Sequence, residues 1–146
     1  QAIVFGIQGF VVDLWGRRPS YITWAIIFLI SLVGEVYCIM NHYLIPAGIL
    51  QGIKIGVYWN FGDILGFMLV ESVPTHLRGN AQGVRGLFLA VSMIISLILF
   101  FGLNPLIGNF GFVMLIVGIP SVIIAIIIFA LKTEETKGID LTTIEE

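Results

Sequence analysis

The residues best suited to chemistry interrupt a long apolar run that extends from about residue 44 to residue 70. They combine hydrogen-bonding groups, aromatic rings and one charge of each sign: Gln51, Lys54, Tyr58, Trp59, Asn60 and Asp63. Such groups suit noncovalent binding of a small polar molecule, because an amide exchanges hydrogen bonds with hydroxyls and an indole face covers a sugar ring or a cation. The sequence places no Ser-His-Asp set, paired catalytic carboxylates or phosphate-binding glycine loop for chemistry, so we do not expect an enzyme.

The chain is too apolar for a soluble domain of its length. Of its 146 residues, 58% are hydrophobic and 11% are charged, whereas soluble domains average roughly 25% charged residues. A soluble domain of this size buries only about 70% of its unfolded surface, so the apolar runs must lie in a lipid bilayer. A single cysteine, Cys38, excludes an internal disulfide and a multi-cysteine metal site. We expect no metal, no cofactor and, without a basic patch, no nucleic-acid partner.

Four long apolar runs predict an all-α, polytopic membrane protein. They cover about residues 21–40, 44–70, 81 or 87 to 103, and 112–131, and only helices satisfy the backbone polar groups within each crossing. Six of the seven basic residues lie in or beside the segments 13–19, 71–79 and 132–146, which share one side, whereas segments 41–43 and 104–110 on the other side have none. By the positive-inside rule the basic side is cytoplasmic. We therefore predict a multi-pass protein of the cell membrane, with a transmembrane part at 1–131 and a cytoplasmic tail at 132–146.

The beginning of the chain resembles half of a transmembrane helix. Its opening apolar stretch has about 12 residues, whereas a crossing needs about 20. It has no basic leader region or small-residue cleavage site, so it does not resemble a signal peptide. We expect the chain to begin inside a transmembrane helix and to be the C-terminal piece of a larger protein, with one partial and four full helices.

A helix through residues 44–70 would sort the polar side chains onto two faces. Four residues lie within roughly 80° of one another on the first face: Gln51, Lys54, Tyr58 and Gly62. Five lie within about 100° on the second face: Gly52, Gly56, Trp59, Asn60 and Asp63. We expect Trp59, Asn60 and Asp63 to face a cavity. Asp63 is then either a proton-coupling carboxylate or a structural acid near the helix end.

Lys54 is the basic residue that lies inside an apolar run rather than beside a loop. A charge in the bilayer costs about 2.5–3.5 kcal/mol on insertion scales, so it needs a partner or a function. Glu35, in the preceding run, lies at a similar depth and could pair with it. Alternatively, Lys54 binds an anionic substrate.

Three motifs in order resemble those of the major facilitator superfamily. D-L-W-G-R-R at 13–18 resembles its D-x-x-G-R-R loop, E-S-V-P-T-H-L-R-G at 71–79 resembles its E-x-x-P-x-x-x-R-G loop, and E-E-T-K-G at 134–138 resembles the P-E-T-K-G end of sugar porters. The resemblance covers the whole chain and implies the C-terminal part of a twelve-helix fold, from the end of helix 8 to helix 12. The partner it implies is the missing N-terminal six-helix half. Two departures concern the substrate: Glu134 stands where sugar porters have proline, and residues 44–70 lack their G-P-x-P-W stretch.

The resemblance also implies that the loop motifs form a cytoplasmic gate network, which closes when the transporter faces outward. Its members here would be Asp13, Gly16, Arg17, Arg18, Glu71, Arg78 and Glu135. The residue types fit, because the planar guanidinium of arginine pairs with carboxylates through two hydrogen bonds. The main partner of Asp13 would be helix 5 of the missing half. The alternative is that Arg17 and Arg18 only set the topology beside anionic lipid headgroups.

The implied function is transport of a small polar metabolite, a sugar or a related compound, by alternating access. Residues 44–70 would be helix 10, which lines the central cavity of this superfamily, and Asp63 hints at coupling to protons rather than facilitated diffusion. Two alternatives stay open. One is symport of an organic anion that uses Lys54, and the other is a complete four-helix membrane protein that oligomerises and does not transport by itself.

Overall fold

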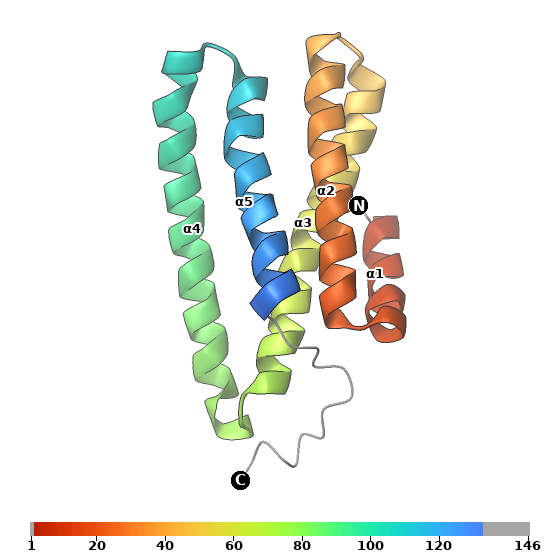
Figure 1. Ribbon diagram of the computed structural model, residues 1–146, viewed down its shortest axis with the longest axis vertical. Coiled ribbons are helices and arrows are strands. Elements are labelled where there is room, and N and C mark those ends of the chain that lie inside the picture. The colour runs from red at the N-terminus through yellow and green to blue at the C-terminus, as the bar shows by residue number, and fades with distance from the viewer. Residues whose placement is uncertain (1, 133–146) are drawn as a thin grey trace.

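The computed structural model describes residues 2–132, which form five α-helices and one short 3-10 turn without any β-strand. The helices are α1 (Ala2–Trp15), α2 (Arg17–Met40), α3 (Leu44–Ser72), α4 (Arg78–Ile107) and α5 (Phe110–Lys132), and the 3-10 turn η1 (Thr75–Leu77) precedes α4. Helices α2 to α5 run alternately up and down (Figure 1). Four spans are long and apolar enough to cross a membrane: Arg17–Met40, Leu44–Ser72, Thr75–Ile107 and Phe110–Leu131. The predicted all-α, polytopic fold is therefore confirmed.

The helix ends follow from a few residues with special backbone or capping properties. Gly16, at a φ of 97°, separates α1 from α2, because this region of φ favours glycine. Gly108, at a φ of 67°, ends α4 in the left-handed conformation, and its N–H donates to the carbonyl of Asn104 over 2.9 Å. The side-chain oxygen of Asn109 then accepts from the N–H groups of Gly111 at 3.0 Å and Phe112 at 3.3 Å, which caps α5.

The predicted turn at 104–110 is shorter in the structure. Helix α4 continues through Asn104 and Pro105 as far as Ile107. Proline removes only its own N–H bond to the preceding turn, so the helix can extend a few residues further until Gly108 closes it.

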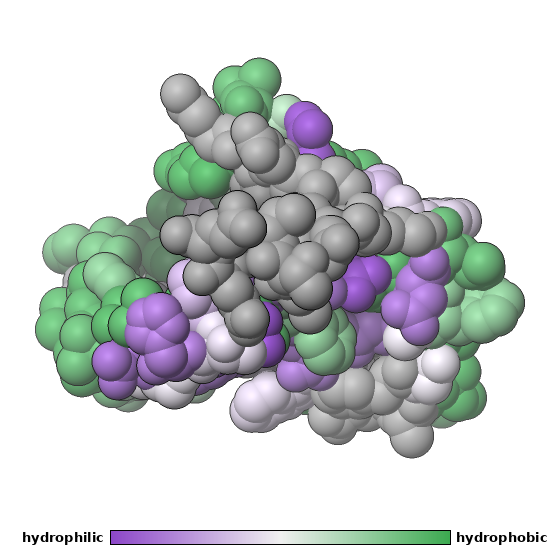
Figure 2. Space-filling model, turned by 90° about the horizontal axis from the view of Figure 1, so that it is seen from below, coloured by the Kyte–Doolittle hydropathy of each residue, from purple (hydrophilic) through white to green (hydrophobic). Residues whose placement is uncertain are grey.

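The charged loops lie together at one end of the bundle. The turn between α1 and α2, the turn between α3 and α4, and the end of α5 share the lower end in Figure 1, and the segments 41–43 and 108–109 share the upper end. Seen from below, hydrophilic residues gather around the helix ends with hydrophobic residues at the margins (Figure 2). The arrangement of the basic segments on a single side is thus confirmed for the described residues.

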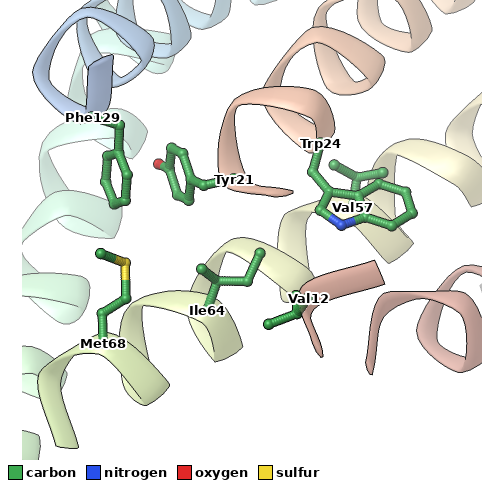
Figure 3. Close-up of a cluster of buried hydrophobic side chains, with 7 residues drawn as sticks. All are labelled: Val12, Tyr21, Trp24, Val57, Ile64, Met68 and Phe129. Carbon is green, nitrogen blue, oxygen red and sulfur yellow. The ribbon is translucent and has the colours of Figure 1, made fainter. Parts of the chain in front are cut away.

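The core lies where α2 crosses α3, α1 and α5. Its buried apolar residues are Val12, Tyr21, Trp24, Val57, Ile64, Met68 and Phe129 (Figure 3). The rings of Tyr21 and Phe129 are stacked with their centroids 3.6 Å apart, which joins the start of α2 to the end of α5. By contrast, no residue of α4 is buried. The faces of α4 need lipid or further helices to cover them.

Candidate functional site

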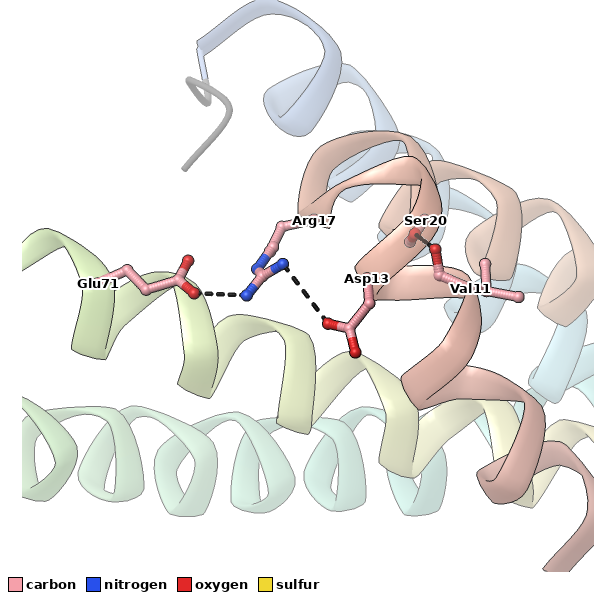
Figure 4. A network of polar contacts seen from close by, with 5 residues as sticks. All are labelled: Val11, Asp13, Arg17, Ser20 and Glu71. Atoms are coloured by element: carbon pink, nitrogen blue, oxygen red, sulfur yellow. Dashed lines mark hydrogen bonds and ion pairs between the residues drawn. The ribbon is translucent and has the colours of Figure 1, made fainter. Parts of the chain in front are cut away.

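Arg17 forms the centre of an ion-pair network at the lower end of the bundle. Its Nη2 donates to Oε1 of Glu71, at the end of α3, over 2.6 Å, and its Nη1 lies 3.9 Å from Oδ1 of Asp13 on α1 (Figure 4). The side chains of Arg17 and Glu71 are only 18% and 21% exposed, whereas that of Asp13 is 79% exposed. The contact with Glu71 is therefore the stronger of the two, because solvent screens the contact with Asp13. Gly16 is buried and makes the sharp reversal that brings Arg17 beside Asp13.

The other basic residues of this end bind backbone carbonyls. Arg18 donates from Nη2 to the carbonyl of Ala130 near the end of α5. Arg78 donates from Nε to the carbonyl of Val73 over 3.2 Å and so closes the loop after α3. The two adjacent arginines thus tie α2 to two different helices, α3 and α5. Glu135, the second predicted acidic member of the network, lies outside the described residues.

Glu35 and Lys54 form a second ion pair, inside the membrane-spanning part. Nζ of Lys54 donates to Oε2 of Glu35, and the two side chains are 12% and 5% exposed. The sequence hypothesis that these residues pair is confirmed. The charge of Lys54 already has a counter-ion, so an anionic substrate would have to displace a buried carboxylate to use it.

A cavity of about 540 Å³ lies between α3 and α4. Its polar and aromatic lining residues are Tyr58, Trp59, Phe61, Asp63, Arg85, Phe88 and Ser92. Trp59 and Asp63 face a cavity as expected, but Tyr58 and Gly62, from the other predicted face, line it as well. The cavity therefore covers a wider arc of α3 than the polarity pattern indicates.

A second cavity, of about 740 Å³, opens further along α3 among α2, α4 and α5. It is lined by Lys54 and by residues that include Phe28, Ser92, Ser96 and Met114. Tyr58, Ser92 and Met93 line both cavities, so the two spaces adjoin. Gln51 is exposed and lines neither cavity.

The expectation that Asn60 faces a cavity is wrong. Asn60 is fully buried, lines neither cavity, and its backbone carbonyl accepts a 3.4 Å hydrogen bond from Nε2 of Gln8 on α1. Three residues along a helix correspond to a rotation of about 60°, which carries Asn60 beyond Asp63 and onto the core-facing side. Gly56 and Ile64 are buried on the same side. The side-chain amide of Asn60 has no hydrogen-bond partner within residues 2–132.

Arg85 is a cavity residue that the sequence reasoning counted with the loop charges. It lies two turns inside α4 and donates from Nη2 to the carbonyl of Gly62 and from Nη1 to Oε1 of Gln82 over 3.0 Å. A Cβ atom on Gly62 or Gly66 would lie 3.2 or 3.0 Å from the guanidinium, so these two glycines form its seat on α3. The sequence shows the four-residue spacing of the two glycines, but it does not show which side chain lies against them.

These features define a polytopic helical membrane protein with an ion-pair network at one end and cavities lined by charged and aromatic residues within its spans. Its sequence matches the family described as "Sugar (and other) transporter" over residues 3–137. The chain belongs to that family, and this family points to a transporter rather than an enzyme. No curated protein sequence and no solved structure matches the chain.

Proposed function

We propose that the chain is the C-terminal part of a secondary transporter, which moves a small polar metabolite across the cell membrane by alternating access. On this proposal α1 is the end of helix 8, α2 to α5 are helices 9 to 12, and a further six-helix half completes the path. Membership of the transporter family supports the class of function. The single observation that carries the mechanism is the contact of Arg17 with Glu71, because it ties the ends of two spans on the side where the basic loops gather.

The network would act as a gate that is closed in one state and broken in the other. Alternating access requires one end of the bundle to close while the other opens, so contacts at an end must differ between two states. A partly screened ion pair is worth at most about 1 kcal/mol, which shifts a two-state equilibrium about fivefold. That magnitude suits a bias between states of similar energy better than a role in holding the fold together.

Asp63 is the candidate for coupling to protons. Its side chain is exposed to the cavity between α3 and α4, and within residues 2–132 its carboxylate has no hydrogen bond or ion pair. A carboxylate inside a membrane span that no cation neutralises is available to take up and release a proton. The basic loops support a cytoplasmic location for this end of the bundle, by the positive-inside rule.

The experiment uses the protein encoded by the complete reading frame, reconstituted in vesicles. We expect Arg17→Ala and Glu71→Gln each to slow uptake about fivefold without lowering the amount inserted. The exchanged pair Arg17→Glu with Glu71→Arg should recover part of the rate. Ser121→Ala is the matched control, because Ser121 is exposed on α5 and, among residues 2–132, bonds only the carbonyl of Val117 in its own helix. Uptake at the wild-type rate in both single variants would refute the gate.

A further inference from the structure

The cavity between α3 and α4 holds one positive and one negative side chain that do not pair with each other. Asp63 and Arg85 both line it, and the ion pairs among residues 2–132 include neither of them. Both residues lie inside helices long enough to span the membrane. An ionisable residue within a span is a candidate functional residue, so the cavity that these two charges line is a candidate site for a charged ligand.

Arg85 is held in place before any ligand arrives. Its guanidinium rests on Gly62 and Gly66, binds the carbonyl of Gly62, and is braced by Gln82, whose Nε2 reaches the carbonyl of Gly66 at 3.4 Å. A guanidinium has five N–H donors in a planar fork, and the recorded bonds use only part of them. The remaining donors suit a carboxylate, for which this fork is the natural partner.

The side chains that α3 contributes to the cavity suit a cation. Trp59 is 53% exposed and Tyr58 is 42% exposed, and their rings meet edge to face with centroids 5.9 Å apart. An indole face attracts a quaternary or primary ammonium group, and the carboxylate of Asp63 lies on the same wall of α3.

We infer that this cavity binds a zwitterionic metabolite, with its carboxylate on Arg85 and its ammonium group between Asp63 and Trp59. The inference rests on the proposed function and names its substrate class. A zwitterion satisfies both protein charges at once, whereas an anion or a cation leaves one of them unpaired and a neutral sugar leaves both. Asp63 then holds either a proton or the ammonium group, so the two compete for it.

Four small compounds separate these cases. Glycine betaine carries both charges, choline lacks the carboxylate, 3,3-dimethylbutyrate replaces the ammonium nitrogen by carbon, and D-glucose carries no charge. Binding is measured by the rise in melting temperature of the purified protein from the complete reading frame, and uptake is measured separately in vesicles. We expect betaine to bind at least tenfold more tightly than the other three.

The variants assign each charge to its residue. Arg85→Gln should weaken betaine and 3,3-dimethylbutyrate at least tenfold and leave choline unchanged, while Asp63→Asn should weaken betaine and choline and leave 3,3-dimethylbutyrate unchanged. The control Ser121→Ala should change none of these. If Arg85→Gln does not fold, the Asp63→Asn pattern decides alone.

Three results would be decisive beyond the expected pattern. No preference for betaine, or glucose binding that neither variant alters, overturns the inference and leaves the proposed transporter intact. In another outcome each single variant is less stable, the double variant Arg85→Gln with Asp63→Asn regains the stability, and betaine has no effect. That result would show that the two charges only balance each other, and it would also overturn the inference. Betaine binding without uptake supports the site and contradicts the proposed function.

Discussion

Neutralising Glu35 alone should destabilise the bundle more than neutralising Glu35 and Lys54 together. The two side chains are 5% and 12% exposed and form an ion pair between α2 and α3. Glu35→Gln leaves the ammonium group of Lys54 buried without its counter-ion, which costs about 3–5 kcal/mol in buried pairs. Lys54→Gln leaves the opposite charge and should cost a similar amount. With both charges removed, the two amides can bond each other, so the double variant should lie close to the wild type.

The assay is a double-variant cycle of unfolding free energies, measured by titrating the protein in mild detergent with a denaturing one. We expect the double variant to be several kcal/mol more stable than the sum of the single effects predicts, because each single variant leaves a buried charge without its partner and the double variant leaves none. Single effects that add within about 0.5 kcal/mol would refute the pairing, because independent sites behave in that way. Uptake by the double variant distinguishes the two hypotheses for Lys54. A wild-type rate of uptake assigns Lys54 a structural role, and loss of uptake indicates that Lys54 binds the substrate.

Three further substitutions, the first with a matched control, test other contacts. Gly66→Ala places a Cβ 3.0 Å from Nη1 of Arg85, so the guanidinium must shift. The variant should therefore lack the stabilisation of about 0.5–1 kcal/mol that Gly52→Ala, which meets open space, should show in the same titration. Gly16→Ala forces alanine to a φ of 97° and should lower the free energy of unfolding by about 1–3 kcal/mol. A crystal structure or a cross-link between α1 and α2 should show the turn displaced. An unchanged stability would contradict the backbone strain. Asn60→Leu removes a buried amide without partners in residues 2–132 and should stabilise the protein by about 1 kcal/mol with uptake unchanged. Loss of uptake would instead indicate that Asn60 takes part in substrate binding.

Hydropathy and charge predicted the spans and the grouping of the loops because both depend on the solvent rather than on side-chain packing. Each residue of a span must lie in lipid or protein, and each charged loop must lie in water. Composition alone therefore determines the alternation of spans and loops along the chain. The contact of Glu35 with Lys54 was predictable for the same reason, since a charge in a span needs a partner at its own depth.

The placement of Asn60 and Arg85 depends on packing, which the sequence pattern does not contain. A helical wheel gives the angle between Asn60 and Asp63 but not which neighbouring helix covers each of them. The guanidinium of Arg85 lies against two glycines of α3, a different helix. These glycines precede Arg85 by 19 or more residues, so the local sequence around Arg85 does not indicate the contact. Counting charges per loop therefore assigned an arginine that lies inside α4 to the loop before it.

The distribution of contacts along α3 indicates where the bundle can move. Helix α3 is joined to α2 near one end by Arg17 and Glu71 and in the other half by Lys54 and Glu35, and the main apolar core lies between these points. Against α4, which buries none of its residues, α3 has the side chains of Gln82 and Arg85, which bond two of its carbonyls, and the two adjoining cavities. We therefore expect α2 and α3 to move as one unit and the contact between α3 and α4 to differ between the two states of the transporter. A ligand seated between Asp63 and Arg85 would bridge that contact, so its binding energy acts directly on the motion that opens or closes the ends.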